Sequence, residues 1–345
     1  MTPRESSCRC SAGASAAAPA GGTGDKALCA CTGLSHRGRA WAELLRLPAL
    51  FSVPGDALAG TAATGAAPNA RTLLAIGSSL CLYEAGMALN DWADRDIDAV
   101  ERPHRPLPSG RIRPAAALTA ACALTGAGLA LASCAGRPAL AVAGPLAATV
   151  WAYDLGLKHT PAGPVAMATA RGLDLLLGAA ATTGRTRPAL PSAALLGTHT
   201  LAVTAVSRQE AQGGSPLAPL AALATTALLT RVVTHRSAEH RGTTALDLLG
   251  PPATPHRGPV LGRKPAAHLT TALAAAYAAA TARPYFHATL NPSPPLTQRA
   301  VGAGVRATIP LQATLTARSR GTATALLIAA LAPLGARYAK KVSVT

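Results

Sequence analysis

Apolar segments close to membrane-spanning length recur along this chain, from Trp41 to near its carboxyl end. A helix needs about 20 residues to cross a hydrocarbon core about 30 Å thick, and most of the segments approach that length. They cover residues 44–63, 72–89, 115–132, 139–153, 164–182, 189–206, 217–233, 266–282, 300–317 and 323–334. The pattern predicts a multi-pass transmembrane bundle.

The composition supports helices in a membrane. Only 14% of the 345 residues are charged, whereas soluble domains carry about 25%. Low charge also excludes a disordered chain, which would be polar. Alanine, the best helix former, dominates the apolar share, so we expect an all-α fold. A large soluble protein with buried helices is the alternative, but so many uncharged segments leave little polar surface for water.

The charge balance is basic, with 32 Lys and Arg against 15 Asp and Glu. Such a balance fits either a nucleic-acid binder or a membrane protein with basic cytosolic loops. The apolar segments favour the membrane, so we expect no nucleic-acid partner. Connector 90–114 carries five arginines, whereas connector 133–138 holds only Arg137. This asymmetry predicts that 90–114 faces the cytoplasm. Connector 235–265 is also basic, yet counting the membrane crossings that precede it would place it outside the cell. The topology of the second half therefore stays open.

Two parts of unequal length are expected. Residues 1–36 are rich in Ala, Gly, Ser and Cys and lack the apolar stretch of a signal peptide, which predicts a disordered cytosolic tail. Cys8, Cys10, Cys29 and Cys31 offer four thiolates to a soft metal, although their spacing is not that of a common zinc site. Residues 37–345 are expected to form one transmembrane domain.

One acidic stretch stands apart, because it follows directly on an apolar segment. Each residue of an α-helix turns about 100°, so three carboxylates would share an arc of about 60°. They belong to Asp91, Asp94 and Asp98. Asp96 would point to the far side, and Glu84 would extend the stripe into the apolar segment.

Like charges on one face repel each other and lose hydration near a membrane. A hard cation such as Mg²⁺ relieves both costs, because it prefers oxygen ligands and bridges to phosphate. Asn90, at the edge of the arc, would serve as a neutral oxygen ligand or orienting group. The alternative is a solvated acidic helix end, but four of only 15 acidic residues fall within 91–98.

Two arginines follow the acidic stretch in a proline-rich loop. Pro103, Pro106 and Pro108 end the helix and stiffen the loop, which keeps Arg102 and Arg105 near the carboxylates. Guanidinium groups bind phosphate oxygens in pairs, so this combination suits a diphosphate. Alternatively, the arginines only mark the cytosolic side of the membrane.

The run Asn90-Asp91-x-x-Asp94-x-x-x-Asp98, followed by Arg102-Pro103-x-Arg105-Pro106-Leu107-Pro108-Ser109-Gly110, resembles the first aspartate-rich motif of the UbiA superfamily of intramembrane prenyltransferases. The resemblance covers about 41–345. It implies an all-α bundle of about nine transmembrane helices around a central cavity. It also implies Mg²⁺-dependent transfer of a prenyl group from an isoprenyl diphosphate to a lipophilic, often aromatic, acceptor.

The chain departs from the superfamily pattern at the second aspartate-rich motif. The matching stretch, 207–214, contains one acidic residue, Glu210, which would complete a second metal site or act on the acceptor proton. This stretch, with 83–87, 291–294 and 309–312, is similar to a divergent EboC-like subgroup whose acceptors are not obvious.

The resemblance also assigns cations to the diphosphate. In the family a Tyr and a Lys of the connector after the fourth segment help bind it, and here they match Tyr153 and Lys158, with Arg208 as a further candidate. Lys158 could equally be an ordinary boundary lysine. Arg171 and Asp174, one turn apart within a segment, suit an internal ion pair or a substrate role equally well.

Together these features predict an integral protein of the cell membrane with its site facing the cytoplasm. Asp91, Asp94 and Asp98 would hold Mg²⁺, while the metal and the arginines neutralise the leaving diphosphate. The rival hypothesis is a membrane protein that binds or transports a polyprenyl (di)phosphate, or a prenylated metabolite, without turnover.

Overall fold

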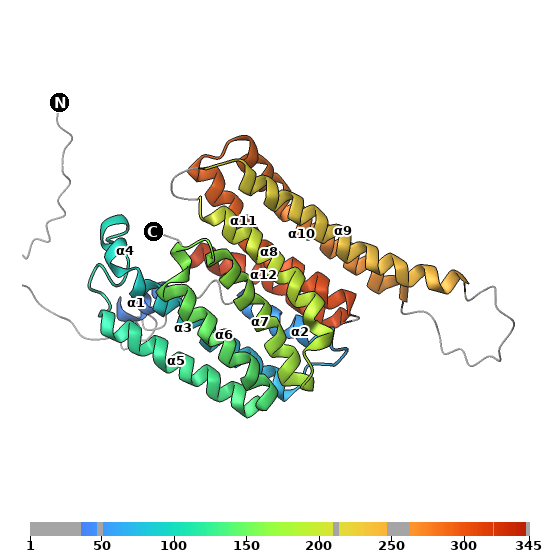
Figure 1. Cartoon of the computed structure of the whole chain (residues 1–345), viewed down its shortest axis with the longest axis horizontal. Helices are drawn as coiled ribbons and strands as arrows, with labels where there is room; N and C mark the ends of the chain where they lie inside the picture. The colour runs from blue at the N-terminus through green and yellow to red at the C-terminus, as the bar shows by residue number, and fades with distance from the viewer. Residues whose placement is uncertain (1–35, 47–50, 210–213, 247–262, 320, 343–345) are drawn as a thin grey trace, which may run out of the picture.

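The computed structural model describes residues 36–46, 51–209, 214–246, 263–319 and 321–342, and all regular structure within them is helical (Figure 1). The α-helices are α1 (His36–Leu44), α2 (Val53–Ala63), α3 (Ala70–Ala93), α4 (Arg95–Glu101), α5 (Pro114–Ala135), α6 (Arg137–Leu155), α7 (Gly163–Thr183), α8 (Leu190–Ser207), α9 (Leu217–Leu246), α10 (Arg263–Leu290), α11 (Pro294–Arg318) and α12 (Thr322–Val342). Short 3₁₀ helices, η2 (Leu157–His159) and η3 (Arg187–Ala189), precede α7 and α8. The all-α prediction is confirmed.

Five helical stretches in the described residues are long and apolar enough to cross a membrane. They are 70–93, 114–135, 163–183, 187–207 and 217–235. The other predicted segments are also helical, but α2, with 11 residues, is shorter than a full span, and the count of about nine spans stays a prediction. The first predicted segment, 44–63, is divided: α1 ends at Leu44, and α2 begins at Val53 with Pro54 in its first turn, where no helical N–H is lost.

Helix α2 lies deep in the bundle because glycines let it approach α7. A Cβ atom on Gly60 would collide with the backbone carbonyl of Leu175, and one on Gly178 would collide with the backbone of Ala57. Small residues allow such close packing between helices in a membrane. Thr182 of α7 then bridges to Thr61 of α2 and Thr72 of α3 at oxygen–oxygen distances of 2.8 and 2.7 Å.

Several connectors meet at one end of the bundle, here called the loop end. They are the connectors 94–113, 156–162 and 208–216 and the turn 291–293. Lys158 of connector 156–162 forms an ion pair with Asp94 of connector 94–113. Arg208, just after α8, donates a hydrogen bond to Thr160 of connector 156–162. The amide of Gly214 then donates to the carbonyl oxygen of Pro292 at 3.3 Å. The predicted site residues therefore gather from separate connectors at the loop end.

Candidate functional site

A cavity of about 670 Å³ lies between α3, α6, α7, α8 and α11. One end carries the charged and amide groups of Arg46, Asn90, Arg102, Arg105 and Asp154. The other end carries Ser79, Arg171, Asp174 and His199, and apolar side chains lie between the two. Ser79 and Asn90 are eleven residues apart on α3, which corresponds to about 16 Å along a helix axis. The cavity thus has an outer end, next to the connectors, and an inner end, within the bundle.

Asp91 and Asp98 are drawn together by one arginine. Both are buried, with only 4% and 2% of their surface exposed. The Arg105 guanidinium lies 2.7 Å from Asp98 Oδ2 and 3.4 Å from Asp91 Oδ1. Arg102 approaches Asp98 at 3.6 Å from the more exposed side. The structure therefore places the two predicted arginines against the predicted carboxylates.

The expectation of one uninterrupted helix through the acidic stretch is wrong at Asp94. Helix α3 ends at Ala93 and α4 begins at Arg95, with Asp94 between them at φ −89° and ψ 2°. Backbone bonds from the Asp94 amide to Asn90 and from the Asp98 amide to Asp94 preserve the helical spacing. Because the break is so small, Asp91 and Asp98 still share a partner.

Asp94 contacts a different cation from its neighbours. Lys158 Nζ, on η2, lies 2.6 Å from Asp94 Oδ1, and His159 Nε2 lies 3.7 Å away. Lys158 is almost fully buried, as a site lysine would be. Asp94 is thus joined to a connector some 60 residues further along the chain, a contact that helical periodicity cannot reveal.

Asp96 and Glu84, the two further acidic residues near the three clustered aspartates, lie in different environments. Asp96 is 84% exposed and pairs only with its neighbour Arg95, as expected for the far face. Glu84 is buried within α3, as its place in the apolar segment predicts, and it does not line the cavity. Neither of its carboxylate oxygens has a hydrogen-bond partner among the described residues.

Sequence analysis missed two charged groups of the outer end. Arg46, just after α1, lies 3.2 Å from Asp91 Oδ1. Asp154, which follows the apolar segment 139–153, accepts a 3.0 Å hydrogen bond from the Asn90 amide. Burial raises the pKa of the Asp154 carboxyl to about 6, although the Asn90 bond and Lys158 oppose the rise. The scarcity of acidic residues was a signal for Asp154, but Arg46 looked like any boundary arginine.

The region of the second motif is only partly described. Arg208, at the end of α8, donates to the carbonyl oxygen of Thr160 and so lies over the connector that carries Lys158. Glu210 falls outside the described residues, as do Cys8, Cys10, Cys29, Cys31 and the predicted tail, 1–36, apart from the first helical residue. Their predicted roles stay predictions.

The inner end is built from different contacts than expected. Arg171 Nε forms its ion pair with Asp56 Oδ2 of α2 at 3.1 Å, rather than with Asp174. Asp174 instead accepts a hydrogen bond from Ser79 of α3. The amide nitrogen of Gln312, on α11, donates to Asp56 Oδ1 at 2.6 Å. Asp56 and Gln312 were absent from the predicted site, although each is a polar group inside an apolar segment.

His199 adds a fifth helix, α8, to the inner end. Its Nδ1 lies 3.0 Å from the Tyr277 hydroxyl, and its Nε2 lies 3.0 Å from the carbonyl oxygen of Gly304. That carbonyl can only accept, so Nε2 carries the proton, and Nδ1 of the neutral ring accepts from the tyrosine. The inner end therefore holds separate groups of buried polar contacts, one around Asp56 and one around His199.

The donor set at the outer end suits a hard divalent cation in its chemistry. Asp91, Asp94, Asp98 and Asp154 offer only oxygen, which Mg²⁺ prefers. As they stand, the carboxylates are paired with protein cations or the Asn90 amide, and the described residues include no group of three or more His, Cys, Asp or Glu side chains arranged to hold a metal. Binding Mg²⁺ would require arginine and lysine side chains to change partners.

The sequence model of the UbiA prenyltransferase family matches residues 50–238, more than half of the chain. The chain belongs to this family. The five apolar helices and the family membership make it an integral membrane protein. The match does not separate subgroups, so the EboC-like assignment of this UbiA family member stays a prediction.

Curated relatives of this UbiA family member include named synthases. Digeranylgeranylglyceryl phosphate synthase of Methanopyrus kandleri is 34% identical over 148 residues, which cover 41% of this chain and 53% of that protein. The Methanothrix thermoacetophila synthase of the same name is 40% identical over 107 residues, which cover 31% of this chain and 40% of that protein. Rice chloroplastic chlorophyll synthase (Oryza sativa subsp. japonica) is 36% identical over 123 residues, 33% of each. The chain spans about half or less of the length of these relatives.

Solved structures of other family members share the fold. A UbiA homologue from Archaeoglobus fulgidus bound to GPP and Mg²⁺ superposes with a TM-score of 0.54 at 18% identity, covering 81% of this chain and 98% of that one. A homologue from Aeropyrum pernix K1 gives 0.52 at 19% identity, covering 74% and 96%. At such low identity the likeness supports the helical bundle alone.

Proposed function

We propose that this UbiA family member is a Mg²⁺-dependent intramembrane prenyltransferase that moves a prenyl group from an isoprenyl diphosphate to a lipophilic, often aromatic, acceptor. The observation that carries the proposal is a cluster of carboxylates and cations beside the outer end of a largely apolar cavity. Arg102, Arg105 and Asp154 line that end. The three predicted metal ligands and Lys158 do not line it, but Asp91 and Asp98 pair with the lining Arg105. The names of the curated relatives and the GPP and Mg²⁺ bound to the Archaeoglobus homologue support it.

The outer end is suited to exchange one set of charges for another. Its main carboxylates, on Asp91, Asp94 and Asp98, are now paired with arginine and lysine side chains. A divalent cation could take the place of those side chains, and a diphosphate could then accept the arginines and the lysine as its own partners. Asp91, Asp94 and Asp98 would hold the metal, with Asn90 as neutral ligand or orienting group. When bound, Mg²⁺ would neutralise charge on the leaving diphosphate.

The released cations would bind the phosphate oxygens. Arg102 and Arg105 carry planar guanidinium groups that match phosphate geometry, and Lys158 supplies a compact charge. Arg208 lies over the Lys158 connector and would complete the set. These donors stabilise the charge that develops as the bond between the allylic carbon and its oxygen breaks.

The middle of the cavity would protect the reacting carbon. Leu82, Met87, Leu146, Val150 and Met167 line it and exclude water from a cationic allylic carbon. The acceptor then forms the new bond to that carbon and loses a proton. Glu210 is our candidate for receiving this proton or for completing a second metal site; the two roles remain alternatives.

A matched pair of variants tests the outer end. Asp94→Asn removes the charge that faces Lys158, and we expect Mg²⁺-dependent diphosphate release from allylic diphosphates to fall by about 100-fold or more. Asp96→Asn removes an equivalent charge from the exposed side and should release diphosphate at the wild-type rate. The assay uses purified full-length protein in detergent, with donors of several chain lengths. Equal losses in both variants would contradict the proposed site.

A second candidate function is binding or transport of a polyprenyl (di)phosphate, or of a prenylated metabolite, without turnover. The single acidic residue of the second motif, Glu210, favours it. Tight, Mg²⁺-dependent binding of geranyl diphosphate with no diphosphate release, across a panel of aromatic and lipid-alcohol acceptors, would support this candidate over the transferase.

We also propose that residues 37–345 form one domain behind a tail, 1–36, and that the loop end faces the cytoplasm from the cell membrane. A protease site inserted beside Ser109, which is exposed at the loop end, should be cut in inside-out vesicles but not in intact cells. Cleavage in intact cells alone would reverse the orientation.

A further inference from the structure

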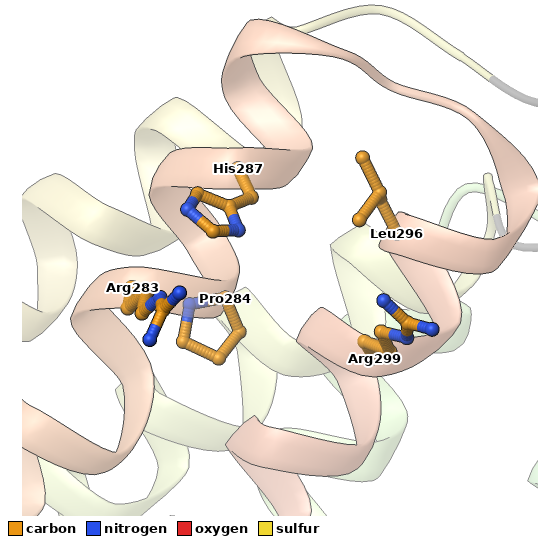
Figure 2. Close-up of a pocket in the computed structure, with 5 residues that line it drawn as sticks. All are labelled: Arg283, Pro284, His287, Leu296 and Arg299. Carbon is orange, nitrogen blue, oxygen red and sulfur yellow. The ribbon is translucent and has the colours of Figure 1, made fainter.

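A second pocket lies outside the cavity, between the end of α10 and the start of α11 (Figure 2). It has a volume of about 260 Å³. Three of the five side chains that line it are basic or can become so: Arg283 and His287 of α10 and Arg299 of α11. Pro284 and Leu296 form an apolar wall. The pocket shares no lining residue with the cavity, so it is a separate site.

The protein supplies no counter-charge to this pocket. The sequence contains no Asp or Glu after Asp247, so α10 and α11 carry cations only. Within the described part of the chain, neither arginine nor His287 takes part in an ion pair or side-chain hydrogen bond. The arginines of the outer end, such as Arg105, all have carboxylate partners by contrast. Cations that line a hollow without a carboxylate suit an external anion.

The pocket opens away from the protein interior. Tyr285 and Ala288 of α10 pack with Ala300 of α11 in a buried cluster. Arg283 and His287 lie on the opposite face of α10, because a residue turns about 100° around a helix, and Pro284 lies at the border between the two faces. The ligand must therefore come from the surroundings of the bundle and not from its cavity.

In an integral membrane protein, the end of a long bundle helix is expected near the boundary between lipid and water. The 28 residues of α10 correspond to about 42 Å, which exceeds a hydrocarbon core of about 30 Å. The pocket occupies the last two turns of α10, at the loop end, so we infer that it lies near the headgroup layer. Phe286 and Leu290, 50% and 69% exposed, stand among the pocket residues and offer apolar surface to acyl chains.

We propose that this pocket binds the phosphate group of an anionic phospholipid. Guanidinium groups bind phosphate oxygens in pairs, and basic pockets between transmembrane helices are known sites for acidic headgroups. Arg283 and Arg299 clamp the phosphate from the two helices, His287 donates a further hydrogen bond, and the acyl chains lie along the apolar surface of α10. The lipid thereby links α10 to α11 at the loop end.

Lipid binding is measured on purified full-length protein by native mass spectrometry and by thermal stabilisation. The probes are phosphatidylglycerol, zwitterionic phosphatidylcholine and inorganic phosphate. We expect phosphatidylglycerol to bind and stabilise the protein more than phosphatidylcholine does, and Arg299→Gln to weaken that binding about fivefold. Arg113→Gln removes an exposed charge at the same end of the bundle and serves as the matched control. It should retain full binding.

Three outcomes would overturn the proposal. The first is equal binding of the anionic and zwitterionic lipids. The second is equal loss in Arg299→Gln and Arg113→Gln. The third is competition by inorganic phosphate at concentrations equal to the lipid, which would assign the pocket to a soluble anion. Arg299→Lys keeps the charge and the fold, and we expect an intermediate affinity because a lysine binds phosphate through a single point charge.

Discussion

The two ends of the cavity use the same residue types in opposite ways. At the outer end, carboxylates are paired with arginines that remain partly open to solvent, with Arg46 and Arg102 about half exposed. At the inner end, Asp56 and Gln312 are wholly buried, and Arg171 completes their network. Partly exposed ion pairs contribute little to stability, whereas breaking a buried pair leaves an uncompensated charge.

This difference in burial indicates which end of the cavity can exchange its ion-pair partners. Most cations of the outer pairs, such as Arg105 and Lys158, belong to connectors, which can rearrange without unpacking a membrane-spanning helix. The inner network joins α2, α7 and α11 across their packed interfaces, so its groups hold the helices in place. We therefore expect substitutions at the inner end to reduce stability and substitutions at the outer end to reduce ligand binding.

The largest effect is expected for Arg171→Met, which leaves Asp56 buried without its cation. The free energy of unfolding should fall by about 3 kcal/mol. Thermal unfolding of purified protein in detergent measures it, with Arg113→Met as the exposed control. A variant as stable as the wild type would show that the inner end is not structural, and would erase the contrast between the two ends.

An intermediate effect is expected for Arg105→Gln. This arginine bridges Asp91 and Asp98. Without it, Asp91 keeps Arg46 and Asp98 keeps Arg102, so stability should change by about 1 kcal/mol or less. Binding of geranyl diphosphate with Mg²⁺ should weaken by about tenfold or more, because a charge-assisted phosphate contact is lost. Isothermal titration measures the affinity. If Arg105→Gln unfolds at a temperature at which the wild type remains folded, Arg105 has a structural role.

The smallest effect is expected from salt. Raising the ionic strength from about 0.1 to 1 M shortens the Debye length from about 10 to 3 Å and screens exposed charges more than buried ones. Diphosphate affinity at the outer end should drop a few-fold, while the melting temperature of Arg171→Met relative to wild type should stay the same. A salt-dependent stability difference at Arg171 would mean that water reaches the inner end.

The local part of the site was predictable because helix geometry is short-ranged. Asp91 and Asp98, seven residues apart, face one arginine, while Asp96 points to solvent, as the 100° rotation requires. The same rule overstated continuity at Asp94, where a lysine from another connector is the partner.

The sequence alone determined the helices, their approximate limits and the pairing of an acidic stretch with the arginines that follow it, because these depend on hydropathy and on neighbours within a few turns. Only the tertiary structure decided that Arg46 meets Asp91, that Asn90 meets Asp154 and that Gln312 meets Asp56, across 45, 64 and 256 residues of chain. Such partners depend on which helices pack together, and Gly60 and Gly178, which admit α2 beside α7, set that packing through the space that they leave empty.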